Sequence, residues 1–150
     1  MIDVAGLSIR RIAVTDAEAA ASLSGELGYP VSVEGMEERI RCLADLADHA
    51  VFVARIGEQL VGWIDVGVTH HLQANTYAEI GGLVVSSGFR SAGVGKKLVA
   101  HAEQWAAARG IQRMVVRSQI AREGAHRFYL REGYERTKTS AVFSKTLSGG

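Results

Sequence analysis

The sequence predicts a single mixed α/β domain over residues 1–150. One observation is size, because a chain of 150 residues with 47% hydrophobic and 22% charged residues can bury one sizeable core. A second is the alternation of strand-like and helix-like patterns in the order β-α-α-β-β-β-α-β-α-β. A third is that neither an internal repeat nor a linker-like composition divides the chain.

Local signals set the boundaries of these elements. Thr15, followed by Glu18, forms a capping box at the start of the first helix, and Ser32 can cap the second. Gly57-Glu58 is a hairpin signal, and Gly133 stops the last helix. The predicted strands span residues 7–14, 50–56, 60–68, 77–85, 112–117 and one or two segments within 134–147. The predicted helices span residues 15–27, 33–47, 95–110 and 122–132.

Charge and cysteine content exclude several functional classes. The 17 Lys and Arg residues against 16 Asp and Glu give a net charge of +1, which argues against a nucleic-acid-binding face. The first residues lack the apolar run of a signal peptide or membrane span, so we expect a cytoplasmic protein without a membrane partner. Cys42 is the only cysteine, and we expect a half-buried packing thiol in a reducing compartment.

The stretch most informative about chemistry runs from Gly88 to Lys97, between a predicted strand and a predicted helix. Its glycines allow backbone N–H groups to converge at a helix start, which favours phosphate binding. A Walker A loop is excluded, because Arg90 stands where that motif needs glycine and Lys97 where it needs Ser or Thr. A dinucleotide-binding fingerprint is also excluded, because Leu98 occupies the position of its third small residue.

Two sequence blocks resemble the GNAT acetyltransferase superfamily. Arg90-x-x-Gly93-x-Gly95 is similar to the family's pyrophosphate loop, and the strand before it, 77–85, resembles the strand that precedes that loop. Ala125-x-x-Phe128-Tyr129-x-x-x-Gly133-Tyr134 looks like the family's last conserved helix. The resemblance implies a GNAT fold, in which helices flank a central mixed and mostly antiparallel sheet, and acetyl-CoA as co-substrate.

The resemblance also implies a set of acetyl-CoA-binding residues. Leu83, Val84 and Val85 would contact the pantetheine arm, and the Leu83 N–H would face the thioester carbonyl, where a fixed donor stabilises the developing oxyanion. The pyrophosphate would be held by the loop residues Arg90, Ser91, Ala92, Gly93, Val94, Gly95 and Lys96. Arg122 departs from the family pattern, which frequently has asparagine there, and this leaves one CoA contact in question.

The resemblance implies two catalytic residues, each with an alternative. Tyr129 aligns with a tyrosine that often protonates the departing CoA thiolate; a phenol pKa of about 10 lies above the thiol pKa of about 8.5, so this transfer is downhill. The alternative is an aromatic side chain in the core. Glu79 occupies the position of a general base in some members, whereas the alternatives are a carboxylate that only binds the amine or pairs with a cation.

The acceptor site is less well defined by sequence. Trp63, Asp65 and His71 are weaker candidates for it, and the adjacent His70-His71 pair lacks the spacing of a metal site, so we expect no metal. The expected acceptor is a small-molecule primary amine, such as an aminoglycoside, a polyamine or an amino-acid-like compound. A protein lysine or N-terminus and a non-catalytic acyl-CoA-binding module remain as alternatives, and a homodimer is a further expectation.

Overall fold

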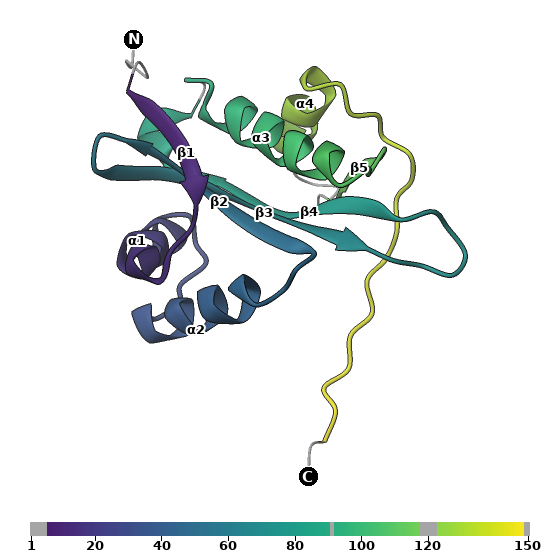
Figure 1. The fold of residues 1–150 in the computed structure, drawn as a ribbon, viewed down its shortest axis with the longest axis horizontal. Helices are drawn as coiled ribbons and strands as arrows, with labels where there is room; N and C mark the ends of the chain where they lie inside the picture. The colour runs from purple at the N-terminus through teal and green to yellow at the C-terminus, as the bar shows by residue number, and fades with distance from the viewer. Residues whose placement is uncertain (1–5, 91, 118–122, 149–150) are drawn as a thin grey trace. The chain divides into compact units, whose positions relative to one another are not determined.

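Five strands in the order β1-β2-β3-β4-β5 form the sheet of this computed structural model (Figure 1). The structure describes residues 6–90, 92–117 and 123–148. It divides into two compact units, residues 1–117 and 118–150, and each is described by itself. The family-like mixed, mostly antiparallel sheet predicted from the sequence is confirmed, whereas the single domain remains a prediction.

All neighbouring strands pair antiparallel except β4 and β5, which are parallel. The strands are β1 (Leu7–Arg11), β2 (His49–Ile56), β3 (Gln59–Thr69), β4 (Tyr77–Val85) and β5 (Met114–Val116). The hairpin predicted at Gly57-Glu58 joins β2 to β3, and Gly57 has the positive φ of 61° that such a tight turn favours. The predicted bounds of β4 are confirmed, and β5 is shorter than predicted.

Helices cover both faces of the sheet in the first unit (Figure 1). They are α1 (Ala17–Glu26), α2 (Val33–Ala44) and α3 (Val94–Ala108), with short 3-10 turns at Val14–Asp16 and Ser87–Phe89. Helices α1 and α2 contribute an apolar cluster, against which Trp63 of β3 packs; its members are Ala17, Ala20, Ala21, Met36 and Ile40. The face under α3 is also apolar, with Ile64, Val66 and Leu98 fully buried, so burial of both faces stabilises the sheet.

The two N-terminal helices begin differently from each other. Ser32 caps α2 as predicted, since its Oγ accepts a hydrogen bond of 3.0 Å from the Gly35 N–H. The capping box predicted at Thr15 and Glu18 is wrong, because α1 begins one residue later, after Asp16. The carboxylate of Asp16 instead accepts the Ala13 N–H at 2.7 Å, which holds the chain in a 3-10 turn before the helix.

The position of Cys42 also differs from the prediction. The thiol is exposed rather than half-buried. Met36 and Ile40 of α2 are buried, and Cys42 lies two residues beyond Ile40, about 200° around the helix axis. The geometry of the helix therefore turns this cysteine away from the core.

The second unit contains α4 (Glu123–Arg131), which ends two residues before Gly133; this glycine has a positive φ of 93°, as expected of the predicted helix stop. The strands predicted within residues 134–147 are wrong, since residues 134–148 form no regular element. Val142, Phe143 and Leu147 are exposed there. A strand needs a partner for its backbone groups, and the described residues of this unit contain no other strand for it to pair with.

Candidate active site

The first feature of the site is an open edge along β4. Pairing between β4 and β5 joins Ala78 to Met114 and ends where Ile80 meets Val116. Since β4 continues to Val85, residues 81–85 have no β5 partner within the described ranges. An unpaired strand edge offers N–H and C=O groups to an extended ligand.

The three predicted pantetheine-binding residues lie on this open part of β4. Leu83 and Val85 are half-buried and Val84 is buried. Recruitment of their backbone groups is compatible with this packing, because a side chain in the core leaves the N–H and C=O directed along the sheet. Their contact with pantetheine, and the oxyanion role of the Leu83 N–H, stay predictions.

A β-bulge lies at the start of the open edge. Asp65 pairs with Gly82 and Val66 with Ile80, so Gly81 is an extra residue on β4. The paired glycines Gly81 and Gly82 predict that another group lies close to the strand backbone. In the structure, side chains of β3 occupy that position. A Cβ on Gly81 would lie 3.1 Å from Oδ2 of Asp65, and a Cβ on Gly82 would lie 3.2 Å from the Trp63 ring.

The glycine loop ends in a helix start that can hold an anion. Gly93 is the N-cap of α3 with a φ of 89°, a left-handed conformation that glycine adopts readily. The Lys97 N–H donates to the Gly93 carbonyl at 3.1 Å, so the N–H groups of Val94, Gly95 and Lys96 precede the first helical hydrogen bond. Three N–H groups at the positive end of a helix dipole suit a phosphate.

The other residues of the predicted pyrophosphate loop differ in how accessible their donor groups are. Arg90 is exposed, so its guanidinium is accessible to solvent. The Ala92 N–H already donates to the Phe89 carbonyl, at 3.3 Å. Ser91 lies outside the described residues. The binding roles of all these loop residues stay predictions.

Glu26 at the end of α1 supports the turn before this loop and was not identified from the sequence. Its Oε1 accepts hydrogen bonds from the Ser87 N–H at 3.1 Å and from the Ser87 hydroxyl at 2.7 Å. These two bonds lower the pKa of the Glu26 carboxyl below its usual value. The carboxylate form therefore links α1 to the turn that leads into the loop.

Glu79 belongs to a hydrogen-bonded group on β4 and after β5. Its Oε1 accepts a hydrogen bond from Nε of Arg117 at 3.1 Å. Arg117 Nη2 also donates to the Tyr77 hydroxyl at 3.2 Å, and Nε2 of His71 lies 3.1 Å from the same oxygen. The bond to Tyr77 and the charge of Glu79 raise the pKa of Arg117 above its usual value. The structure thus realises the alternative in which Glu79 pairs with a cation, while its role as a base stays a prediction.

Asp65, the weaker candidate on β3, has a partner that the sequence analysis missed. Its Oδ1 is hydrogen-bonded to Nε2 of His49 on β2. Trp63 shares the face of Asp65, as the alternation predicts, and packs against the cluster under α1 and α2. Glu79 lies on the same face, because it pairs with Gly67, two residues after Asp65.

Tyr129 lies on α4 in the second unit. Its ring makes edge contacts with Phe128 and Tyr134, at centroid distances of 5.1 and 5.8 Å. Arg122, where the family frequently has asparagine, lies outside the described residues. The acid role of Tyr129 stays a prediction.

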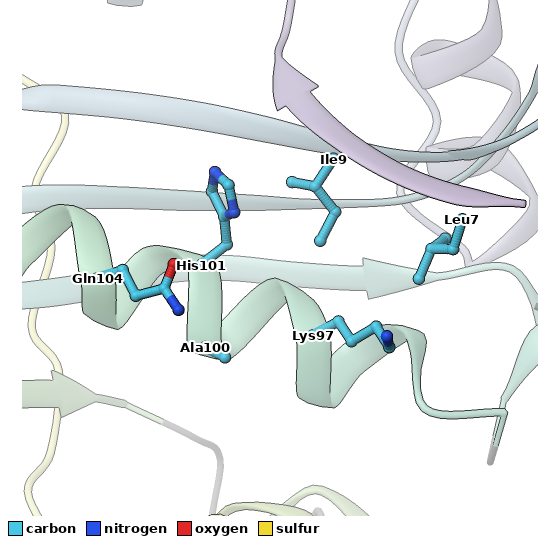
Figure 2. A pocket seen from close by; sticks show the side chains of 6 residues that line it. All are labelled: Leu7, Ile9, Lys97, Ala100, His101 and Gln104. Atoms are coloured by element: carbon cyan, nitrogen blue, oxygen red, sulfur yellow. The ribbon is translucent and has the colours of Figure 1, made fainter. Parts of the chain in front are cut away.

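A pocket of about 360 Å³ lies apart from these residues, between β1 and α3 (Figure 2). Leu7 and Ile9 of β1 face His101 and Lys97 of α3 across it. It contains none of the predicted site residues. In the part of the chain that the structure describes, no three His, Cys, Asp or Glu side chains gather as metal ligands, and no helix is long and apolar enough to cross a membrane.

Comparison with known proteins identifies the family. The model of the acetyltransferase (GNAT) family matches residues 16–134, so the chain belongs to this family. An aminoalkylphosphonate N-acetyltransferase of Salmonella typhimurium is 37% identical over 116 residues, which are 77% of this chain and 73% of that protein. An aminoglycoside N(6')-acetyltransferase of Stenotrophomonas maltophilia is 29% identical over 139 residues, 89% of this chain and 90% of the relative.

Solved structures agree on the fold. An aminoglycoside N-acetyltransferase in complex with CoA superimposes with a TM-score of 0.84 at 19% identity, covering 94% of this chain and 95% of that one. The enzyme from Acinetobacter baumannii, also an aminoglycoside 6'-N-acetyltransferase, has a TM-score of 0.83 at 18% identity, with 95% and 100% covered. The protein is therefore an N-acetyltransferase acting on an amine, with acetyl-CoA as its co-substrate, as the sequence predicted.

Proposed function

We propose that the protein transfers the acetyl group of acetyl-CoA directly to the primary amine of a small molecule, without an acetylated enzyme intermediate. The amine nitrogen attacks the thioester carbonyl, the carbon–sulfur bond breaks, and CoA leaves as a thiol. In this scheme Glu79 accepts the proton of the ammonium, the Leu83 N–H stabilises the oxyanion, and Tyr129 protonates the sulfur. Arg117, which donates a hydrogen bond to Oε1 of Glu79 at 3.1 Å, would hold this carboxylate in a fixed position on the sheet face.

The observation that carries this proposal is the change in β4 after Ile80. Among the described residues the strand has no β5 partner beyond Ile80, and α3 begins nearby in sequence with three N–H groups that precede its first helical hydrogen bond. These two features supply backbone groups suited to an extended pantetheine arm and to a pyrophosphate. Backbone donors fixed by a strand and a helix need no reorganisation when charge develops, which favours catalysis.

For the acceptor we propose a short amine with an anionic end, of the aminoalkylphosphonate type. The relative from Salmonella typhimurium acts on such compounds, and it is more similar in sequence than the aminoglycoside-modifying relative. The charges on the sheet face fit this choice. Carboxylates of Asp65 and Glu79 are accompanied by Arg117 beside Glu79 and by Arg113, whose guanidinium lies 5.6 Å from the centre of the Tyr77 ring.

A polycationic acceptor fits this balance less well. An aminoglycoside carries several ammonium groups, which would meet the guanidinium groups of Arg113 and Arg117 as well as the carboxylates. An ammonium and a phosphonate on one short molecule can each meet an opposite charge. A polyamine, an amino-acid-like acceptor and a protein N-terminus remain as outcomes of the test.

The test is thiol release from acetyl-CoA with a matched amine panel. The panel holds 2-aminoethylphosphonate, propylamine as the analogue without an anionic end, spermidine, kanamycin and a lysine-containing peptide. We expect kcat/KM to be highest for the phosphonate. It should be at least about tenfold lower for propylamine, because propylamine lacks the anionic group and loses one charge-assisted contact. Preference for kanamycin or the peptide would contradict the acceptor class. CoA binding without turnover of any amine would favour a non-catalytic module.

We also propose a homodimer in a reducing, cytoplasmic compartment. Exposed Val142, Phe143 and Leu147 support self-association, since exposed apolar side chains gain from burial. The exposed free thiol of Cys42 supports a reducing compartment. Light scattering after size-exclusion chromatography tests the first point: a monomer at all concentrations would contradict the dimer.

A further inference from the structure

The hydrogen bond between His49 and Asp65 has a location that points to a role in acceptor binding. It joins β2 to β3 on the sheet face that also carries Glu79. Both side chains are partly accessible, with 22% of His49 and 28% of Asp65 exposed. A ligand on this face can therefore reach the pair.

Two glycines make room for this pair on the sheet surface. His49 lies opposite Gly67, and a Cβ on Gly67 would lie 2.5 Å from Nδ1 of the imidazole. Asp65 reaches across to β4, where a Cβ on Gly81 would lie 3.1 Å from its Oδ2. Any larger residue at 67 or 81 would displace a ring or a carboxylate, so these glycines allow both side chains to lie flat over the strands.

The two oxygens of Asp65 have different surroundings. Oδ1 is held by His49, whereas Oδ2 accepts no hydrogen bond from any described residue. Oδ2 faces Gly81, which lies between Glu79 and Leu83 along β4. The pairing with β5 ends at Ile80, so this oxygen lies over the position where the edge of β4 becomes available.

This arrangement is not needed to hold the strands together. Buried apolar residues, among them Val53, Val61 and Ile64, already fix β2 against β3, and the Gly57 turn sets their register. A partly buried carboxylate with one oxygen unpaired costs free energy unless a donor approaches it. Oδ2 of Asp65 therefore suits a cationic group from a ligand.

We propose that Asp65 binds the ammonium group of the acceptor through Oδ2, and that His49 is the positioning residue that directs this carboxylate. This inference rests on the proposed function and assigns the acceptor's cationic group to a particular atom. An ammonium at Oδ2 lies over β4 between the proposed base, Glu79, and the proposed oxyanion donor, Leu83. In this scheme Asp65 binds and orients the ammonium, Glu79 then accepts its proton, and the resulting neutral amine attacks the thioester carbonyl.

The test is steady-state kinetics on the full chain, with KM measured separately for acceptor and acetyl-CoA. We expect Asp65→Asn to raise the acceptor KM about tenfold or more while the acetyl-CoA KM stays within about twofold, because only a charge-assisted contact to the acceptor is lost. His49→Ala should raise the acceptor KM less. His49→Gln should restore it, because the glutamine amide can donate from the position of Nε2.

Two further variants separate binding from folding. Gly81→Ala keeps every charged group but moves the Asp65 carboxylate, and we expect the same selective rise in acceptor KM. Glu38→Gln on the exposed surface of α2 is the matched control for loss of one carboxylate and should change neither KM. If Asp65→Asn fails to fold, Gly81→Ala and the pair of His49 variants carry the test alone.

The outcomes distinguish this inference from the proposed function. An active wild-type enzyme whose Asp65→Asn or Gly81→Ala variant keeps the wild-type acceptor KM would overturn the inference alone. Equal rises in both KM values, or no rescue by His49→Gln, would make the pair a purely structural one and also overturn it. A wild-type protein that acetylates no amine would overturn the proposed function, and this inference with it.

Discussion

The two halves of the proposed active site are built from different parts of the chain. The proposed cofactor half would use backbone groups of residues 83–85 on β4 and of residues 94–96 at the start of α3. The proposed acceptor half would use the side chains of His49, Asp65 and Glu79, which come from three different strands. The first half needs glycines that free the backbone, whereas the second needs glycines that make room for side chains.

This difference has a functional consequence. Backbone donors bind any ligand of the right shape and charge, so the cofactor half can remain the same in enzymes with different acceptors. Side chains can be exchanged without disturbing the strands that carry them, so the acceptor half can change its specificity. Substitutions should therefore affect the KM of one substrate and not of the other.

The largest expected effect concerns Tyr129, whose side chain is the proposed general acid of the cofactor half. Tyr129→Phe should lower kcat roughly 100-fold, the usual size of general acid catalysis, while both KM values stay near wild type. Thiol release at saturating substrates measures this. Tyr134→Phe, which removes a hydroxyl from the neighbouring ring, is the matched control. An unchanged kcat in Tyr129→Phe would mean that the cofactor half works without a side-chain acid.

A second prediction concerns the backbone at the start of α3. Gly93 has a φ of 89°, and a side chain in that conformation costs about 1–2 kcal/mol. Gly93→Val should therefore raise the acetyl-CoA KM about tenfold without changing the acceptor KM. Calorimetry of CoA binding checks the effect directly, with Gly25→Ala in α1 as a control at ordinary helical angles. A rise in the acceptor KM alone would contradict the division into halves.

A third prediction supplies a stability change that should leave both halves unaffected. Hydrogen bonds from Arg10 lower the pKa of Asp16, so the folded protein binds this proton more weakly than the unfolded chain does. The ion pair should add about 1 kcal/mol to the free energy of unfolding above the unfolded pKa of about 3.9. The contribution should disappear as pH falls from there through the folded pKa.

Urea denaturation of the wild type and of Asp16→Asn measures this effect. The difference between the two proteins should be present at neutral pH and vanish in acid, where Asp16 is protonated in both states. Both KM values of Asp16→Asn should equal those of the wild type at neutral pH. A stability difference that persists in acid would assign the effect to packing rather than to the charge of Asp16.

The smallest expected effect concerns Glu26, which supports the turn before the loop from outside. Glu26→Ala removes both hydrogen bonds to Ser87 and should raise the acetyl-CoA KM by about twofold, because exposed polar contacts contribute little. The acceptor KM should not change. Glu18→Ala, in the first turn of the same helix, is the control. A larger rise in the acceptor KM than in the acetyl-CoA KM would mean that α1 supports the acceptor half of the site.

The elements that carry the proposed cofactor half were easier to predict from the sequence than the side-chain contacts of the proposed acceptor half, for a physical reason. A backbone site leaves its glycines at fixed spacing in one stretch, and the loop at Gly93 was located this way, between the strand pattern of β4 and the apolar helical stripe of α3. A pair such as His49 and Asp65 appears only when the register of two strands is known. One signal was available: Gly67 stands opposite His49 in the hairpin, and an interior strand glycine indicates a close approach.

The failures in the fold have a similar origin. The pattern within residues 134–147 suits a strand, but a strand also requires a neighbour, which local sequence does not reveal. Cys42 lies in an amphipathic stretch, and its exposure depends on which residues of α2 face the sheet. In both cases the outcome depended on contacts with other helices or strands, which the local sequence does not reveal.

The β2–β3 hairpin contains both members of the His49–Asp65 pair, together with Trp63 and Gly67, and no residue of the glycine loop. A tight turn at Gly57 joins its two strands, so the hairpin is one continuous segment of the sequence. Exchange of this segment between related chains would move His49 and Asp65 together, whereas Glu79 on β4 and the glycine loop would stay in place. We therefore expect an engineered exchange of residues 49–69 to change the acceptor KM more than the acetyl-CoA KM.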